Sequence, residues 1–240
     1  IPITHTFTPF ATRRAFDQIT ISIAYADLPV KMMGTDPGVT AELNGGTHMS
    51  FEDAGIMRNL PNVTVVEPAD AAQFKAMFEQ IVYYPKPIYV RMYRRRKEKF
   101  FDDDMKFEIG KIATLKDGSD ITIICSGLMV GQAMIATQML EKDGISVRLL
   151  NMHTLKPVDE ETIVKAAKET GRIVVAENHS IINGWGSAVA EVLAEHYPVP
   201  MKRIGVKDHF GEVGLTDFLL KKYKMTAQDI YDAAMELLKR

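Results

Sequence analysis

The chain has 240 residues, of which 46% are hydrophobic, and its 29 basic and 31 acidic side chains leave a formal charge of −2. This length is enough for one large or two ordinary domains. The near balance of charge argues against nucleic acid or an anionic membrane as a partner, and no apolar stretch approaches the ~20 residues of a membrane-spanning helix.

In the first half of the chain, short apolar runs bounded by turn residues predict buried parallel strands. These runs are Val30–Met33, Val63–Val66 and Ile88–Val90. Helical patterns lie between them at Phe51–Leu60 and Asp70–Tyr84. Asp70 is the expected N-cap of the second helix, and Pro85 the residue that stops it.

The segment Ala15–Ala26 fits two patterns. Its run Ile19–Ile23 alternates apolar and polar side chains as a strand does. One helical face would instead carry four apolar side chains: Ala15, Phe16, Ile19 and Ile23. Periodicity alone leaves this choice open.

Residues Tyr93–Gly118 show no sustained period and an abrupt reversal of charge. The reversal runs from Arg94-Arg95-Arg96-Lys97 to Asp102-Asp103-Asp104. A targeting signal or an anion patch would fit, but a solvated linker explains the run better. We therefore predict a first domain at 1–95, a linker at 96–118 and a second domain at 119–240.

A cleaner alternation of strands and helices begins at Ile121 and predicts a parallel sheet with right-handed crossovers. The expected strands are Ile121–Cys125, Ser146–Leu150, Arg172–Glu177 and Met201–Ile204. The expected helices are Met129–Lys142, Asp159–Thr170, Gly186–His196, Thr216–Tyr223 and Thr226–Lys239. Thr226 and Asp229 have the spacing of a capping box. The chain as a whole is predicted to be α/β.

The single cysteine, Cys125, ends the first of these strands, so we expect a buried thiol rather than a nucleophile or a ligand. Because no internal disulfide can form, a reducing cytoplasm is the expected location. The chain opens at Ile1 in mid-pattern rather than at Met, which predicts a fragment or a trimmed chain.

The common catalytic signatures are missing from the sequence: it shows no Ser–His–Asp motif, no Cys/His metal cluster and no phosphate loop with its lysine. Gly184 and Gly186 are a weak nucleotide-loop signal, and a tight turn before a helix explains them better. His179 ends a strand where α/β proteins often bind ligands, but a bond to a neighbouring loop is the favoured interpretation. The remaining candidates have no supporting context: His153, His196 and His209. We predict no metal site in this chain.

His48 stands apart because a loop with Gly45 and Gly46 delivers it, and glycines let the backbone approach a ligand closely. Phe7 and Phe10 are three residues apart, so a helical turn would present both rings on one side. They fit core packing or a platform for a flat heterocycle. From composition alone, a structural and a functional role stay open for all three.

The aromatic opening resembles a segment of transketolases. The resemblance begins at Thr6–Arg13 and Ala15–Ile19 and continues through Asn44–His48, Glu52-Asp53, Met57-Arg58, Asn62–Asp70 and Ile88–Arg94. The second half resembles the transketolase C-terminal domain at Leu155–Pro157, Glu177–Ser180 and Arg203–Asp208. The resemblance implies two three-layer α/β/α domains with mostly parallel sheets: a pyrimidine-binding domain, N-terminally incomplete, and the C-terminal domain. It also implies a helix at Ala15–Ala26.

The family resemblance implies that three residues, Phe7, Phe10 and Arg13, belong to the binding site of the cofactor, thiamine diphosphate. Phe7 and Phe10 match the residues that contact its pyrimidine ring. Arg13 falls one turn later, where many relatives have another aromatic side chain.

The same resemblance assigns four residues to the ketose substrate. His48 matches the histidine that bonds the first hydroxyl of the sugar near the reactive carbon, and Arg94 matches the arginine that grips the phosphate. Asp36 replaces a usual phosphate-binding histidine and should repel phosphate. Asn44 replaces a common aspartate that binds a substrate hydroxyl.

Part of the family's active site precedes or lies outside this chain. The glutamate that activates the cofactor belongs before the aromatic segment, and diphosphate and Mg²⁺ bind a domain that split transketolases carry on a separate subunit. The resemblance therefore implies the C-terminal subunit of a split transketolase, which transfers a two-carbon ketol unit between sugar phosphates. It would be inactive alone and would work as a homodimer within a heterotetramer with the N-terminal subunit.

Two other hypotheses remain. One is a different thiamine-dependent subunit, similar to deoxyxylulose-phosphate synthase or to the beta chain of a 2-oxo acid dehydrogenase. The other is a non-catalytic assembly protein of the same fold. The aromatic segment and the run Gly45–His48 favour the sugar enzymes.

Overall fold

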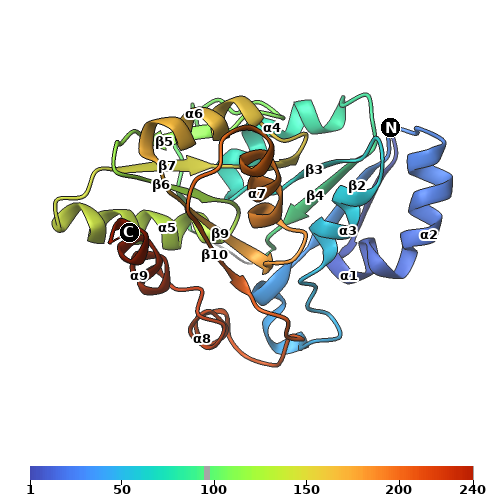
Figure 1. Cartoon of the computed structure of the whole chain (residues 1–240). Coiled ribbons are helices and arrows are strands. Elements are labelled where there is room, and N and C mark those ends of the chain that lie inside the picture. Colours follow the sequence, from blue (N-terminus) through green and yellow to red (C-terminus); the bar gives the residue numbers. More distant parts are fainter. Residues whose placement is uncertain (95–97, 240) are drawn as a thin grey trace.

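A computed structural model describes residues 1–94 and 98–239. The predicted boundary between 95 and 96 and the linker residues Arg96 and Lys97 lie outside the described residues. The centre of the molecule is a pair of five-stranded sheets, each built mainly from one half of the chain (Figure 1). This arrangement confirms the predicted α/β class with mostly parallel sheets.

The first sheet has the order β1-β2-β4-β3-β8, in which β1 to β4 run parallel and β8 pairs antiparallel with β3. Its strands are β1 (Ile3–Phe7), β2 (Lys31–Thr35), β3 (Thr64–Val66), β4 (Ile88–Met92) and β8 (Thr154–Lys156). The edge strand β8 comes from the second half of the chain, so that half completes the sheet of the first.

The second sheet has the order β10-β9-β6-β7-β5 and is parallel except for β5, which pairs antiparallel with β7. Its strands are β5 (Ala113–Lys116), β6 (Ile121–Cys125), β7 (Val147–Asn151), β9 (Ile173–Ser180) and β10 (Met201–Val206). Register shifts mark the pairings of β5 and β10.

Helices cover both faces of the sheets. The α-helices are α1 (Thr8–Ala11), α2 (Phe16–Ile19), α3 (Asp53–Asn59), α4 (Ala71–Val82), α5 (Met129–Lys142), α6 (Glu160–Thr170), α7 (Trp185–His196), α8 (Thr216–Lys222) and α9 (Ala227–Leu238). The chain also forms the 3₁₀ helices η1 (Arg13–Ala15) and η3 (Gly38–Asn44) and the π-helix η2 (Thr20–Tyr25). Predicted caps form: Asp70 accepts from the Gln73 N–H at 2.7 Å, and Thr226 and Asp229 make a capping box.

Alternate residues of each strand enter two hydrophobic cores, one on each side of the sheets. Met33 of β2 and Ile123 of β6 belong to the core that α4, α5 and α9 cover. Met32 and Ile124 belong to the core on the other side, beneath α3, α6 and α7. Each core therefore runs through both sheets, so the two halves pack as one body.

The strand-like reading of Ala15–Ala26 is wrong, because η1, α2 and η2 make the segment helical, as the family resemblance implied. Its β-branched residues carry the period of a strand, but Ile19 and Ala24 are the residues that pack into the core. The sequence also missed β1, β5 and β8.

The predicted linker is not simply solvated. Strand β5 lies inside it, and Phe101 and Phe107 are buried against the core of α4 and α5. The backbone N–H groups of Phe100 and Phe101 donate to the Asp70 carboxylate at 2.7 and 3.0 Å. This segment is therefore anchored to the start of α4.

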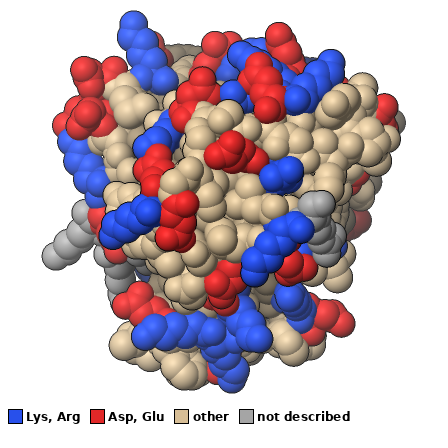
Figure 2. Space-filling view, turned by 60° about the vertical axis from the view of Figure 1, so that its left-hand side comes forward, with Lys and Arg blue, Asp and Glu red and all other residues tan. Residues whose placement is uncertain are grey.

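The surface carries mixed charge: Figure 2 shows Lys and Arg interspersed with Asp and Glu over one face. Within residues 1–94 and 98–239, no helix is both long enough and apolar enough to cross a membrane.

Candidate active site

Three half-buried rings meet where β1 ends. Phe7 is the last residue of β1, and the short helix α1, with Pro9 in its first turn, brings Phe10 around to the same side. The ring centroids of Phe7 and Phe10 lie 6.0 Å apart, and that of His48 lies 5.5 Å from Phe7 and 5.0 Å from Phe10. All three pairs meet edge to face, a favourable aromatic geometry. The structure thus brings together Phe7, Phe10 and His48, which are distant in sequence; we call them the ring cluster.

The loop that carries His48 is held from both sides. The Thr47 hydroxyl bonds His48 Nδ1 at 2.9 Å, which leaves Nε2 for a ligand. Arg13 donates to the Thr47 carbonyl and to Glu52, both at 2.9 Å. A Cβ at Gly46 would come 2.4 Å from the Gly211 carbonyl oxygen, so only glycine lets these backbones meet. Arg13 therefore supports the loop.

Asp36 and Arg94 form an ion pair beside the ring cluster. Asp36 follows β2 with a φ of 54°, and its N–H donates to the Met92 carbonyl at 2.9 Å. Arg94 Nε donates to Asp36 Oδ2 at 2.6 Å, and the Arg94 backbone N–H donates to Oδ1 at 3.3 Å. The guanidinium carbon lies 4.5 Å from the centroid of the Phe7 ring. The pair thus joins the carboxyl ends of β2 and β4 to the ring cluster.

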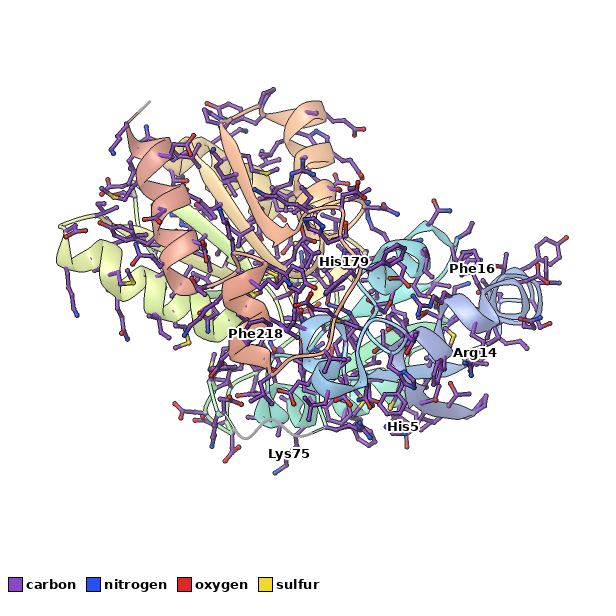
Figure 3. The ribbon with its side chains drawn as sticks, turned by 90° about the horizontal axis from the view of Figure 1, so that it is seen from below. His5, Arg14, Phe16, Lys75, His179 and Phe218 are labelled. Atoms are coloured by element: carbon purple, nitrogen blue, oxygen red, sulfur yellow. The ribbon has the colours of Figure 1, made fainter. Side chains whose placement is uncertain are left out.

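These residues open onto a pocket of about 940 Å³. Phe7, Asp36, Asn44 and Arg94 line it from the first half of the chain, and α8 lines it from the second. Figure 3 shows Phe218 of α8 at this side of the molecule. Parallel α/β sheets bind ligands at the carboxyl ends of their strands, which is where this pocket lies.

Two pocket-lining residues connect its walls. Glu42 has a φ of 48°, and its Oε1 accepts from the Thr216 hydroxyl at 2.6 Å and from the Thr216 N–H at 3.1 Å. This contact ties η3 to the start of α8. The exposed Asn44 donates to the Ala41 carbonyl at 3.0 Å, which orients its side chain at the rim.

Sequence reasoning missed Arg14. Its guanidinium carbon lies 3.7 Å from the centroid of the Phe10 ring, a close cation–π contact (Figure 3 labels Arg14). The spacing of four residues from Phe10 was the available signal, since it is one helical turn. Glu42 and Thr216 were also missed, because 174 residues separate them.

A cluster of buried charged side chains links the two sheets next to the site. Arg91 of β4 is fully buried and donates to Asp53 at 2.7 and 3.1 Å, to Glu67 and to the Asn178 carbonyl at 3.0 Å. Burial raises the pKa of Glu67, while Arg91 opposes that shift. We name Arg91, Asp53 and Glu67 the Arg91 cluster. It joins β4 of the first sheet to β9 of the second.

Asn178, the residue after Glu177 in β9, also fixes the pocket wall. Its side chain accepts from the Val39 N–H at 3.0 Å and donates to the Pro37 carbonyl at 2.9 Å. A Cβ at Gly38 would lie 2.1 Å from Asn178 Oδ1, so the two segments are in direct contact.

Two other histidines, His153 and His179, are buried. His179 is buried, donates from Nδ1 to the Ser180 carbonyl at 2.7 Å and accepts the Gly55 N–H at 3.2 Å. Burial lowers its pKa and lowers that of His153 to about 4, so both rings are neutral. His179 thus bonds residues of β9 and α3, whereas the sequence favoured a bond to a neighbouring loop.

The remaining motifs also have structural explanations. Cys125 is buried, which raises the pKa of its thiol. Gly184 precedes α7, and a Cβ there would lie 2.0 Å from Glu177 Oε2, so the glycine allows close packing. Among the residues that the structure describes, no group of three His, Cys, Asp or Glu is placed to hold a metal ion.

Family models match both halves of the chain. "Transketolase, pyrimidine binding domain" matches residues 1–98, and "Transketolase, C-terminal domain" matches residues 110–230. Together they cover both sheets and the pocket between η3 and α8.

Individual relatives agree with these matches. A 6-deoxy-6-sulfo-D-fructose transketolase subunit of Clostridium sp. is 52% identical over 240 residues, which are 100% of this chain and 74% of the relative. An apulose-4-phosphate transketolase subunit of Phocaeicola vulgatus is 38% identical, and the match covers 96% of this chain and 74% of the relative. A solved structure described as "Split gene transketolase, inactive beta4 tetramer" has a TM-score of 0.93 at 44% identity, and the match covers 100% of this chain and 77% of that one.

Proposed function

The chain belongs to the transketolase family, and from that premise we propose that it is the ketose-binding subunit of a split, thiamine-diphosphate-dependent transketolase. With a partner subunit, it would transfer a two-carbon ketol unit from an anionic ketose to an aldose. The observation that carries this proposal is the ring cluster beside the Asp36–Arg94 pair, at the edge of the 940 Å³ pocket.

The ring cluster fits the pyrimidine end of the cofactor. Phe7 and Phe10 are half-buried, and a flat heterocycle can stack on aromatic faces that are not fully enclosed. Thiamine diphosphate, when bound, would supply the carbon nucleophile that ketol transfer requires. We assign its diphosphate and Mg²⁺ to the partner subunit, so the complete site would be shared.

The chain's own residues bind and orient the sugar. His48 Nε2 would hydrogen-bond the first hydroxyl of the ketose, since Nδ1 is taken by Thr47. Arg94 would bind the anionic end of the sugar. Asn44 would bind a hydroxyl that lies between that end and the first hydroxyl. Arg13 would keep the His48 loop in place through the Thr47 carbonyl.

The name of the Clostridium relative indicates that the anionic end need not be a phosphate, because it specifies a sulfonated fructose. We therefore include sulfonated ketoses with sugar phosphates among the candidate substrates. The other relative named above specifies a sugar phosphate.

Reconstitution tests this function. The chain would be mixed with a candidate partner subunit, thiamine diphosphate and Mg²⁺, and ketol transfer measured with a coupled assay; the chain alone is the control. Turnover of ketoses by the pair only is the expected result. A pair that binds no thiamine diphosphate, or that acts on 2-oxo acids instead of ketoses, would contradict the proposal.

A further inference from the structure

We propose that Asp36 selects the charge of the substrate: the Asp36–Arg94 pair favours a ketose whose distal headgroup carries one negative charge, such as a sulfonate, over a doubly charged phosphate ester. This inference rests on the proposed function. It concerns a residue, Asp36, whose carboxylate stands at the anion-binding end of the pocket.

Asp36 is held in this position by the backbone. Its side chain is 8% exposed and that of Arg94 is 35% exposed, so the carboxylate is the more buried member of the pair, and both residues line the pocket. The Asp36 N–H is bonded to the carbonyl of Met92, and Oδ1 accepts from the N–H of Arg94. A ligand cannot push the carboxylate aside without breaking these bonds.

The ion pair occupies some of the N–H groups of the Arg94 guanidinium. Nε and Nη2 of Arg94 both face Asp36 Oδ2. The outer edge of the guanidinium, formed by Nη1 and Nη2, can still donate two parallel N–H bonds to an anionic headgroup, whether phosphate or sulfonate. Three oxygens of a sulfonate can accept those hydrogens equally well.

The charge of the pocket points the same way. Because Asp36 pairs with Arg94, the two side chains together place no net charge beside the headgroup. A phosphate ester carries about −1.5 to −2 charges at pH 7, with its second pKa near 6, whereas a sulfonate carries one at every pH of interest. The carboxylate of Asp36 therefore repels the phosphate more strongly.

The test is a comparison of substrates by the reconstituted holoenzyme. kcat/KM would be measured for 6-deoxy-6-sulfofructose, fructose 6-phosphate and fructose. We expect the sulfonate to be preferred, and Asp36→Asn to raise the phosphate-to-sulfonate ratio roughly tenfold, the order expected for one charge at a partly exposed site. Asn tolerates the positive φ of this position, and Asp36→Gly, which takes it freely, serves as the second variant.

A matched control and a pH series isolate the charge effect. Asp117→Asn removes the carboxylate of another Asp–Arg pair, with Arg148, outside the pocket, and should leave the ratio unchanged. Lowering the pH from 7.5 to 5.5 protonates the phosphate ester but not the sulfonate, so the preference of the unmodified enzyme should shrink, whereas that of Asp36→Asn should change less.

The outcomes separate this inference from the proposed function. Ketose turnover with a ratio that Asp36→Asn leaves unchanged, a preference for the phosphate, or equal use of uncharged fructose would overturn the inference and leave the function standing. If no ketose were turned over, the inference could still be tested by calorimetry. The affinities of 2,3-dihydroxypropane-1-sulfonate and glycerol 3-phosphate for the same complex would then be compared. Tighter binding of the sulfonate, reversed by Asp36→Asn, supports the inference, and the opposite order overturns it.

Discussion

Replacing Arg91 with Met should destabilise the protein by about 3–5 kcal/mol, because it leaves two buried carboxylates without their cation. Arg91, Asp53 and Glu67 all have fully buried side chains. Asp53 would keep the Tyr89 hydroxyl at 2.7 Å, and Glu67 would keep the hydroxyls of Tyr93 and Ser126, both at 2.6 Å. Those neutral donors offset only part of the lost charge pairing. Met fills a similar volume, so the packing change is small.

The loss of folding stability in Arg91→Met should depend on pH. The pKa of Glu67 is already raised by burial, and removal of Arg91 raises it further. A group whose pKa is raised in the folded state binds more protons there than in the unfolded chain, so its contribution to stability falls as the pH rises. The deficit of Arg91→Met should therefore be larger at pH 8 than at pH 5.5.

Equilibrium unfolding in urea, followed by circular dichroism at one protein concentration, measures both effects. The control is Arg148→Met, since Arg148 pairs with Asp117 and Glu169, whose side chains are 79% and 43% exposed. Exposed pairs contribute less than about 1 kcal/mol. If Arg91→Met cost no more than Arg148→Met, the reasoning from uncompensated buried charge would be refuted.

Three further predictions concern His48, Gly38 and His153. His48→Ala should lower kcat of the reconstituted enzyme roughly a hundredfold with little change in melting temperature, because the ring is half-buried; a large drop in melting temperature would instead make it structural. Gly38→Ala should cost more than about 2 kcal/mol, since its φ is 57° and the added Cβ would lie 2.1 Å from Asn178 Oδ1. Gly171→Ala has a φ of 69° but nothing within 4 Å of the new Cβ, so equal losses in urea unfolding would contradict the contact argument. His153, with its pKa lowered to about 4 by burial, binds fewer protons when folded, so stability should fall as the pH drops from 6.5 to 4 by up to about 3 kcal/mol. His153→Gln should remove that part of the decline, and an unchanged pH profile of unfolding would rule it out.

Most of the strands that the sequence predicted are interior strands of a sheet, such as β6, where every residue is buried, and β10 is the predicted strand that lies at an edge. The strands that it missed lie at the edges of the two sheets. The first three residues of β1 are exposed, and β5 and β8 are short segments whose pairing depends on partners far along the chain. Apolar runs in a sequence indicate strands that are buried on both faces, and an edge strand that is partly exposed lacks such a run.

Phe7, Phe10 and His48 could each be singled out from the sequence because they stand in recognisable local contexts, but their meeting in one cluster was not predicted. The contacts that set their surroundings were not predictable, since the Asp36–Arg94 bonds join residues 58 apart and the Arg13–Thr47 bond joins residues 34 apart. The Arg91 cluster had one signal, a cation within the apolar run Ile88–Met92. Nothing local identified its partners. The roles of these residues in binding remain predictions.

The two shared cores have a consequence for protein engineering. Strand β8 pairs with β3, and both cores run through the two sheets. A chimaera that takes residues 119–240 from one relative and 1–95 from another would therefore combine an edge strand with a foreign neighbour and mix the side chains of both cores. Recombination between relatives should succeed only where Val65 and Val66 stay matched to Thr154–Lys156. The two family segments are separable in sequence, but they pack as one unit of structure.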